Sequence, residues 1–305
     1  MILCIGEILA DLIGEYVGDN VKYERFVGGA PLNVAYGIKK LNGNVGFVGS
    51  VGDDIIGRYL YDFCQKLGFE YLDVYLDPKH NTTLAFVEND PNGERRFCFF
   101  RQNTADYQID DARLEVIEQA NIIHVGSLML REEKGRMLAT KVMELAKKHN
   151  KIISFDINFR DDIYNSTEEA KAIYLEYIKK ADILKFSEDE VELFTGDTNI
   201  SSINKIVKPE QIVFITLGSK GSYFQYGGES VIVESVKIKP VDTTGAGDAF
   251  YACVLKHLNE IDIKNITKEV IVNVLKKANQ CGALACTKKG ALSALPSLEE
   301  LEKSF

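Results

Sequence analysis

The 305-residue sequence has little that would mark a secreted, metal-binding or membrane-spanning protein. Its six cysteines form no Cys-x-x-Cys pair, and the closest two are Cys281 and Cys286, which predicts reduced thiols and no disulfide or zinc framework. No run reaches the ~18 apolar residues of a membrane span. The N-terminus lacks the basic region of a signal peptide and meets Glu7 too early for one. We therefore expect a soluble, cytoplasmic protein that does not bind membranes.

Basic residues are in the minority, with 36 lysines and arginines against 45 aspartates and glutamates and a net charge of −9. An acidic surface disfavours a nucleic-acid partner, because such binding depends on neutralising phosphates. A small anion is still compatible with this charge, since a local site can be positive within a negative field. The four histidines show no metal-ligand spacing, so we assign them no role: His80, His124, His149 and His257.

Two common phosphate-binding motifs are also missing. The sequence contains no Gly-x-x-x-x-Gly-Lys-(Ser/Thr), so any phosphate site is not a P-loop. No Gly-x-Gly-x-x-Gly follows the first apolar strand, which disfavours a nicotinamide oxidoreductase. Low-complexity stretches, internal repeats and Pro-rich linkers are absent too, so nothing in the composition divides the chain.

What is present is an alternation of strand and helix patterns. Apolar runs of strand type alternate with segments whose apolar residues recur at helical spacing. The expected strands are 2–9, 45–51, 122–125, 151–157, 183–186 and 212–217, and the expected helices begin near Pro31 and Asp54 and cover 132–149, 166–179, 248–258 and 268–286. This alternation predicts an α/β fold with a mostly parallel central sheet and helices on both faces.

Two hairpin patterns interrupt the alternation. Residues 13–16 and 22–26 flank a Gly-Asp-Asn turn, and residues 83–87 and 95–101 flank Asn-Asp-Pro-Asn-Gly. We expect these strands to form a small separate sheet that acts as a lid. The predicted division is 1–11, 28–80 and 105–305 for the α/β domain, and 12–27 and 81–104 for the lid.

The most informative segment runs from Val241 to Phe250. Gly245, Ala246 and Gly247 allow backbone amides to crowd together at the start of a helix, where the helix dipole favours an anion. Asp248 would be repelled by a bound phosphate if it only capped the helix. It is suited to accepting a proton from a hydroxyl that attacks the phosphate. The alternative is a glycine turn with an Asp cap.

Three other segments place polar residues at turns. Gly28, Gly29 and Asn33 join the first hairpin to a helix, and paired glycines suit either a close ligand approach or a tight turn. Residues 156–160 and 216–221 leave apolar strands at their carboxyl ends, where ligands of open α/β sheets bind. The second hairpin ends at an arginine, Arg101, which could hold a hydroxyl or phosphate or be solvated.

Together these segments resemble the ribokinase/PfkB family of sugar kinases over essentially the whole chain. The N-terminal signature is similar to residues 28–35 with 47–57, and the C-terminal signature to residues 242–248. Within the family, Gly-Ala-Pro-x-Asn at 29–33 and Asp156-x-Asn158-x-Arg160 resemble the fructokinase branch, as do segments 93–106 and 289–296.

The resemblance implies roles for individual residues. Asp248 would be the catalytic base, and the amides of Gly245, Ala246 and Gly247 the anion hole. The implied sugar-binding residues are Asp11, Gly28, Gly29, Asn33, Arg101, Asn158 and Arg160. The implied nucleotide-binding residues are Lys185, Ser187, Thr216, Gly218, Gly221 and Asn279.

The resemblance also implies cations. Glu190 would organise Mg²⁺ through water, with Ser187 standing where the family often has Asn. The positions that match a monovalent-cation (K⁺) site are Asp242, Thr244, Ala285, Lys288 and Gly290. The serine that often completes that site is Ala294 here.

The expected activity is transfer of the ATP γ-phosphoryl group to a primary hydroxyl of a sugar, with fructose as the acceptor. The alternatives are a kinase for 2-keto-3-deoxygluconate, ribose or a nucleoside, and a catalytically silent regulator that binds sugar or nucleotide. Retention of Asp248 and Glu190 favours catalysis, because a pure binder needs no base in the anion hole. We also expect a homodimer through the lid, with Val27, Phe86 and Phe97 as candidate contacts or, equally, as core residues.

Overall fold

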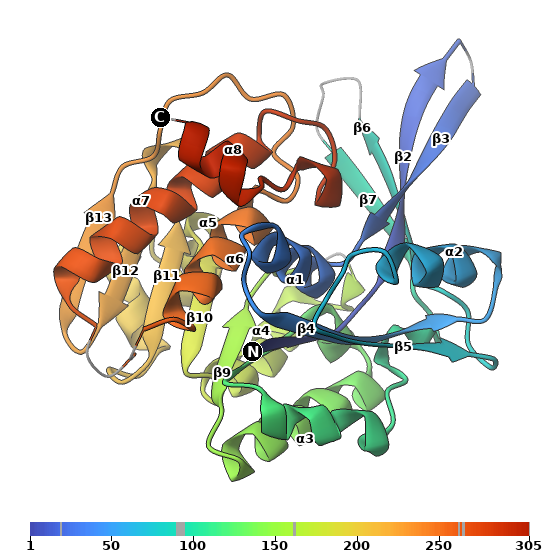
Figure 1. Cartoon of the computed structure of the whole chain (residues 1–305), viewed down its shortest axis with the longest axis horizontal. Coiled ribbons are helices and arrows are strands. Elements are labelled where there is room, and N and C mark those ends of the chain that lie inside the picture. The colour runs from blue at the N-terminus through green and yellow to red at the C-terminus, as the bar shows by residue number, and fades with distance from the viewer. Residues whose placement is uncertain (19, 90–94, 161–162, 262, 264–265, 305) are drawn as a thin grey trace.

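A computed structural model of the chain describes residues 1–305 apart from 19, 90–94, 161–162, 262, 264–265 and 305. It contains one nine-stranded sheet flanked by helices and one separate four-stranded sheet (Figure 1). The predicted α/β fold with a small additional sheet is therefore confirmed. In the part of the chain that is described, no helix is long and apolar enough to cross a membrane.

The large sheet has the strand order β13-β12-β11-β10-β9-β8-β1-β4-β5. Its strands are β1 (Ile2–Ile5), β4 (Val45–Gly52), β5 (Tyr71–Asp77), β8 (Ile122–Val125), β9 (Ile152–Asp156), β10 (Ile183–Ser187), β11 (Ile212–Thr216), β12 (Ser222–Tyr226) and β13 (Glu229–Val233). Neighbours from β11 to β5 pair in parallel, whereas β12 and β13 are antiparallel. The central strands β1, β4 and β8 are buried along their whole length, because helices cover both faces of a parallel sheet.

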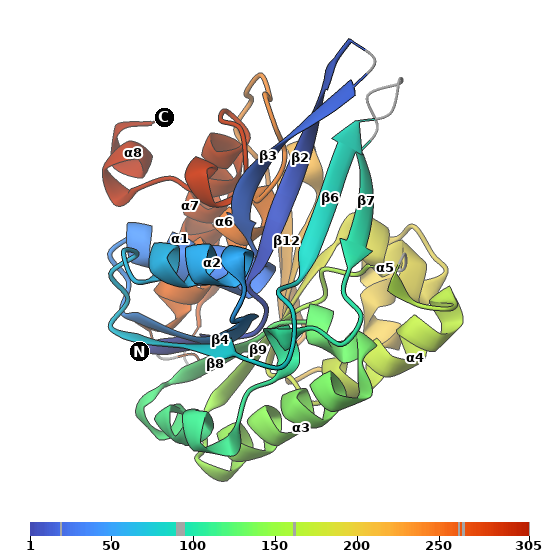
Figure 2. The same ribbon diagram turned by 90° about the vertical axis from the view of Figure 1, so that its right-hand side faces the viewer.

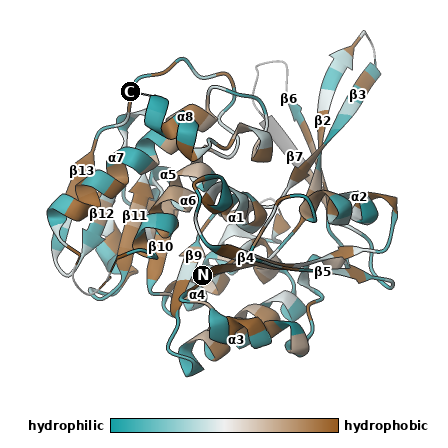
Figure 3. Cartoon of the chain, viewed as in Figure 1, coloured by the Kyte–Doolittle hydropathy of each residue, from teal (hydrophilic) through white to brown (hydrophobic). Residues whose placement is uncertain are grey.

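Helices pack on both faces of this sheet, as predicted (Figures 1 and 2). They are α1 (Ala30–Lys40), α2 (Ile55–Cys64), α3 (Glu133–Lys148), α4 (Thr167–Ile178), α5 (Glu188–Thr195), α6 (Ala246–Leu258), α7 (Lys268–Ala285) and α8 (Leu298–Lys303). One core contains buried residues of α1, α2, α6 and α7, and a second core on the other face contains those of α3, α4 and α5. Figure 3 shows hydrophobic residues along the strands and mixed colouring on the helices.

The small sheet has the order β3-β2-β6-β7 and projects from the large sheet. Its strands are β2 (Leu9–Val17), β3 (Asn20–Gly28), β6 (Leu84–Asn89) and β7 (Arg95–Phe100). Each predicted hairpin is an antiparallel pair, and a parallel pairing of β2 with β6 joins the two. The turn residues 19 and 90–94 lie outside the described part of the chain.

Some elements differ from their predicted extent. The predicted first strand 2–9 is two segments, because β1 ends at Ile5 and β2 of the small sheet begins at Leu9. Strand β5 and helix α5 were not predicted. Helix α5 begins with a reciprocal capping box between Ser187 and Glu190, a pattern that the sequence carries.

Candidate active site

The turn before α6 has the geometry of an anion site. Gly245 precedes the helix with φ 76°, a left-handed conformation that favours glycine. A Cβ built on Gly245 would lie 2.9 Å from Cα of Ala291, so a side chain is excluded here by space as well as by φ. The first amides of a helix have no intrahelical partner, and the dipole is positive at that end. A phosphate is therefore a suitable ligand for this turn.

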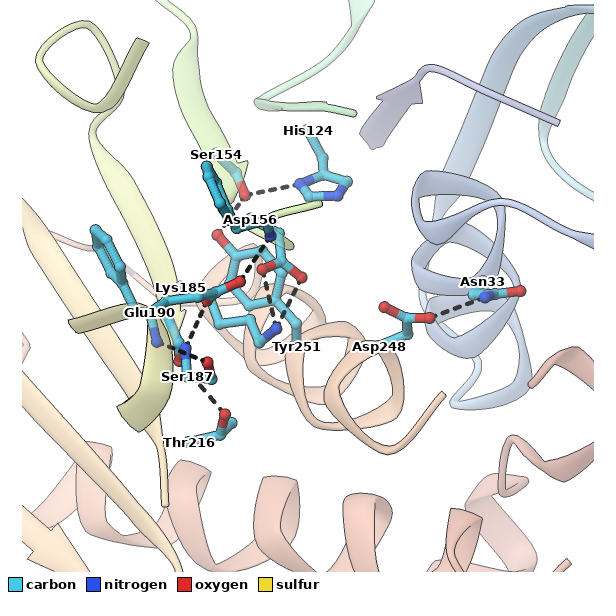
Figure 4. A network of polar contacts seen from close by, with 12 residues as sticks. Asn33, His124, Ser154, Asp156, Lys185, Ser187, Glu190, Thr216, Asp248 and Tyr251 are labelled. Carbon is cyan, nitrogen blue, oxygen red and sulfur yellow. Dashed lines mark hydrogen bonds and ion pairs between the residues drawn. The ribbon is translucent and has the colours of Figure 1, made fainter. Parts of the chain in front are cut away.

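Asp248 lies in the first turn of α6 and contacts a residue of α1. Nδ2 of Asn33 donates a 2.8 Å hydrogen bond to Oδ2 of Asp248 (Figure 4). Burial raises the pKa of Asp248, while the charge of Lys185, the hydrogen bond from Asn33 and the charge of Arg160 oppose that rise. The carboxylate is thus held in place and can accept a proton.

A cavity of about 370 Å³ lies beside Asp248, a size that accommodates a small ligand. Both sheets contribute to its wall, with Asp11 from β2 and Phe99 from β7 facing residues of the large domain. The predicted residues that it brings together are Asp11, Gly29, Asn33, Asn158, Arg160, Lys185, Thr244, Gly245, Gly247 and Asp248. Residues far apart in the sequence therefore share one site.

The paired glycines make room at this site. A Cβ on Gly28 would lie 2.2 Å from Oδ2 of Asp11, on the neighbouring strand β2. Gly29 has φ 119°, and a Cβ there would lie 2.3 Å from the carbonyl oxygen of Glu7. These contacts are with protein atoms and show a tight strand-to-helix turn; the close approach of a ligand stays a prediction.

Arg101 is buried and is not among the residues that line this cavity. Its Nη2 and Nε lie 2.6 and 3.1 Å from Oδ2 of Asp106, and its side chain is 4% exposed. The other oxygen of Asp106 accepts hydrogen bonds from the hydroxyls of Thr83 and Thr104. Arg101 lines a neighbouring cavity of about 870 Å³, so in this structure it fastens the base of the second hairpin.

Lys185 on β10 forms a buried ion pair with Asp156 at the end of β9. Nζ of Lys185 lies 2.9 and 3.0 Å from the two oxygens of Asp156. A Cβ on Gly247 would be only 3.1 Å from the same Nζ, so the amine lies against the anion-binding turn. Burial raises the pKa of Asp156 to about 7, although the charge of Lys185 opposes this.

A second set of polar contacts lies next to this pair (Figure 4). The hydroxyls of Ser154 and Tyr251 are 2.6 Å apart, and Nδ1 of His124 is 3.1 Å from that of Ser154. Burial, together with the charge of Lys185, lowers the pKa of His124 to about 3, so this histidine is neutral at pH 7.

The residues expected to bind nucleotide follow the carboxyl ends of β10 and β11. Ser187 and Thr216 are neighbours in the sheet register. Ser187 caps α5, and the hydroxyl of Thr216 donates to the carbonyl of Phe186 over 3.3 Å. Gly218 and Gly221 have φ 56° and 117°.

Asn279 of α7 is attached to the neighbouring edge of the sheet. Its Nδ2 donates to the carbonyls of Val233 and Glu234 over 3.0 and 3.3 Å. Asn279 thus ties α7 to the end of β13, the strand that the Gly221 turn also approaches.

Glu190, expected near Mg²⁺, is held by backbone amides. Its Oε2 accepts from the amide of Ser187 and its Oε1 from that of Phe159, each over 2.7 Å. A carboxylate oxygen can accept more than one hydrogen bond, so this arrangement leaves acceptor capacity for a water. Within the described residues, no group of three or more His, Cys, Asp or Glu side chains has the arrangement of a metal site.

The positions expected to hold a monovalent cation come together at one loop crossing. Oδ1 of Asp242 accepts from the amide and hydroxyl of Thr244 over 2.8 and 2.7 Å, and Oδ2 accepts from the amide of Gly290 over 3.0 Å. The amide of Asp242 also donates to the carbonyl of Cys286, next to Ala285. The Lys288 side chain instead forms an ion pair with Glu300.

Glu7 lines the cavity and was not predicted. It is 2% exposed, and its Oε1 accepts from the amide of Ala30 over 3.2 Å. The signal for it was a charged residue directly after a buried apolar strand, at the carboxyl end where ligands bind.

The site combines a helix N-terminus suited to a phosphate, a carboxylate beside it and a cavity between two sheets. This combination is typical of a phosphotransferase. The comparison with known families agrees: the pfkB family carbohydrate kinase profile matches residues 1–298. The chain belongs to the pfkB family of carbohydrate kinases.

Relatives named as fructokinases match nearly the whole chain. Fructokinase-1 of Zea mays is 34% identical over 310 residues, covering 99% of this chain and 96% of its own. The structure of a Xylella fastidiosa fructokinase with bound ATP superposes with a TM-score of 0.89 at 28% identity, covering 99% of this chain and 96% of its own. That of a Vibrio cholerae fructokinase double mutant, with fructose, ADP and potassium ion bound, has a TM-score of 0.87 at 32% identity and covers the same shares.

Proposed function

We propose that the chain phosphorylates fructose, using ATP as the donor. The observation that carries this is the placement of Asp248, bonded to Asn33, between the anion-binding turn and the cavity lined by Asp11. The similarity to fructokinases of a plant and of two bacteria supports fructose over the other sugars.

In the proposed reaction, the primary hydroxyl of the sugar lies against Asp248. The hydroxyl oxygen forms a bond to the γ-phosphorus as the bond to the ADP oxygen breaks, and the hydroxyl proton passes to Asp248. The amides of Gly245, Ala246 and Gly247 and the amine of Lys185 stabilise the charge that develops on the phosphoryl group. Asp156 keeps that amine in place.

The sugar is held from both sheets. Asp11 accepts hydrogen bonds from its hydroxyls, and the amide of Asn158 accepts or donates them. We assign Arg160, which lines the same cavity, to the phosphate side. Oδ1 of Asn33 is buried without a hydrogen-bond partner among the described residues, so it is available to a sugar hydroxyl. Gly28 leaves the space that the carboxylate of Asp11 occupies, and Gly29 lets the backbone pass close to the carbonyl of Glu7.

ATP would lie along the carboxyl ends of β10 and β11. The residues that we assign to it are Lys185, Ser187, Thr216, Gly218, Gly221 and Asn279. Glu190 fits Mg²⁺ held through water, because Mg²⁺ keeps several waters and binds mainly to substrate phosphates. When bound, Mg²⁺ neutralises phosphate charge.

Our candidate for the K⁺ site is the loop crossing at Asp242, Thr244, Ala285, Lys288 and Gly290. The carboxylate of Asp242 supplies the charge for a cation there, and the carbonyl of Cys286 lies at the same crossing. The potassium ion in the Vibrio cholerae relative supports K⁺ activation.

We assign residues 12–27 and 81–104 to a lid that closes over the sugar. Phe99 of β7 already lines the cavity, so a small movement of the sheet would cover the sugar and exclude water. Water exclusion would limit wasteful hydrolysis of ATP.

The outer face of the small sheet is our candidate for a homodimer contact. Phe86 packs between Tyr23 and Phe100, and Phe100 is 59% exposed. Val27 is 5% exposed and so belongs to the core, while the side chain of Phe97 lies outside the described part. A sedimentation measurement that gives a monomer would remove this contact. All six cysteines are free thiols, which suits the proposed cytoplasmic location.

The activity test follows ADP production over a panel of acceptors with the purified full chain. The panel contains fructose, ribose, 2-keto-3-deoxygluconate and a nucleoside. ADP formed with fructose above all others supports the proposal, and preference for another acceptor replaces fructose. No ADP with any acceptor would indicate a binding regulator.

A further inference from the structure

Two buried groups of opposite charge each have an atom without a hydrogen-bond partner. Glu7 is 2% exposed, and its Oε2 has no partner among the described residues. Arg101 is 5% exposed, and its Nη1 is likewise unpartnered in the described part of the chain, although Nη2 and Nε bind Asp106. Such groups are rare, because a buried polar atom without a hydrogen bond destabilises the fold.

Both groups lie where the small sheet joins the large one. Glu7 precedes β2, and its partner Ala30 follows β3, so Glu7 connects the two ends of the first hairpin. Arg101 follows β7, and Asp106 binds both Arg101 and Thr83, which precedes β6. Two carboxyl groups therefore hold the two hairpins at their bases. In Figure 2 the bases of the hairpins are the lower ends of strands β2, β3, β6 and β7, next to the large sheet.

The charges around Glu7 are unbalanced in this arrangement. Burial raises the pKa of Glu7 to about 8, and the charge of Asp106 adds to this, while Arg101 and the amide of Ala30 oppose it. The other charged groups on the same cavity are Asp11, Asp248, Arg160 and Lys185. At pH 7 most molecules therefore carry a proton on Glu7, and the ion pair of Arg101 is with Asp106.

We propose that Glu7 is a positioning residue that locks the lid: as the small sheet closes over the sugar, Oε2 of Glu7 gives its proton to solvent and accepts a hydrogen bond from Nη1 of Arg101. This inference rests on the proposed sugar-kinase function. The new bond completes the hydrogen bonding of both buried groups and joins the bases of the two hairpins. A charge-assisted hydrogen bond of this kind is stronger than a neutral one.

The lock couples sugar binding to pH. Because the closed state holds Glu7 ionised, binding releases about one proton per site below the pKa of the free protein. Sugar affinity therefore rises with pH, by at most about tenfold per pH unit, and becomes constant above about pH 8.

Calorimetry tests this with the full chain. Fructose is titrated at pH 7, in the presence of a non-hydrolysable ATP analogue, in two buffers that differ in ionisation enthalpy. The difference in heat gives the number of protons released. We expect about one for the wild type and none for Glu7→Gln, which keeps the acceptor for Ala30 but cannot ionise. Glu144→Gln, on the exposed side of α3, should match the wild type.

Thermal unfolding shows whether Glu7→Gln is folded. If it is not, Arg101→Lys takes its place. This variant keeps the positive charge but removes the forked guanidinium group that, in the proposed lock, binds both Asp106 and Glu7. Fructose binding without proton release in the wild type, or equal release in wild type and variant, would overturn the lock while leaving the kinase function intact. No fructose binding and no sugar-dependent ADP would overturn both.

Discussion

The side-chain amide of Asn33 on α1 donates a 2.8 Å hydrogen bond to the carboxylate of Asp248 on α6. The two residues are 215 positions apart, and each belongs to one of the two sequence segments that resemble sugar-kinase signatures. The bond therefore connects Asn33, which we assign to sugar binding, with Asp248, which we assign as the catalytic base. It also orients the carboxylate toward the cavity.

Loss of this bond should change the pH dependence of turnover. The amide of Asn33 stabilises the ionised form of Asp248 and so lowers its pKa. In Asn33→Ala the pKa of Asp248 should rise, so the acidic limb of the kcat/KM profile moves to higher pH. The profile from pH 5 to 9 checks this. Asn121→Ala serves as the control, because Asn121 is exposed and its side chain contacts Asn259. A shift of the acidic limb that is equal in both variants would count against the assignment of Asp248 as the base.

Removal of the buried amine should cost both stability and turnover. Lys185→Met leaves Asp156 buried without its cation, a change that typically destabilises by about 3–5 kcal/mol. Loss of the cation raises the pKa of Asp156 further above its unfolded value, so the folded state of the variant binds a proton more tightly. The stability of the variant therefore falls as pH rises.

Chemical denaturation of Lys185→Met at pH 5 and pH 8 measures this effect. We expect the difference in the free energy of unfolding between the wild type and Lys185→Met to be larger at pH 8 than at pH 5. The double variant Lys185→Met/Asp156→Asn should recover much of the stability but not the turnover. A double variant with full turnover would show that the amine has no role in phosphoryl transfer.

Gly245 should tolerate no side chain. In Gly245→Ala the left-handed φ costs about 1–2 kcal/mol, and the new Cβ meets Ala291 as well. Gly227→Ala is the matched control, because it has φ 57° with no atom within 4 Å of its Cβ. Thermal unfolding should show a similar cost of the left-handed backbone in both variants. ADP production should be lost only in Gly245→Ala. Turnover retained by Gly245→Ala would exclude this turn as the phosphate site.

Much of the fold could be predicted because the signals are local. Buried parallel strands form continuous apolar runs, and helix starts carry Pro31, Asp54 or Ser166 as position-specific markers. The anion-binding turn was predictable for the same reason, since the left-handed Gly245 and the following Asp248 are adjacent in sequence.

Contacts between distant segments could not be predicted in this way. The ion pair of Lys185 with Asp156, and the position of Glu7 against Ala30, depend on which strands are neighbours in the sheet. Arg101 was expected to face the ligand, but the nearby Asp106 binds it, and residue types alone do not reveal that choice. Strand β5 was missed because its residues are mostly half-buried, as expected of the edge strand that it forms.

In the proposed reaction Asp248 removes the proton from the attacking hydroxyl. The most direct test is the turnover of Asp248→Asn with fructose and ATP, alongside fructose affinity measured by calorimetry. Asp62→Asn, an exposed residue of α2, is the control. We expect kcat to fall by about 10²–10⁴ while fructose still binds and the control is unaffected. Near-normal turnover in Asp248→Asn would show that Asp248 is not the catalytic base.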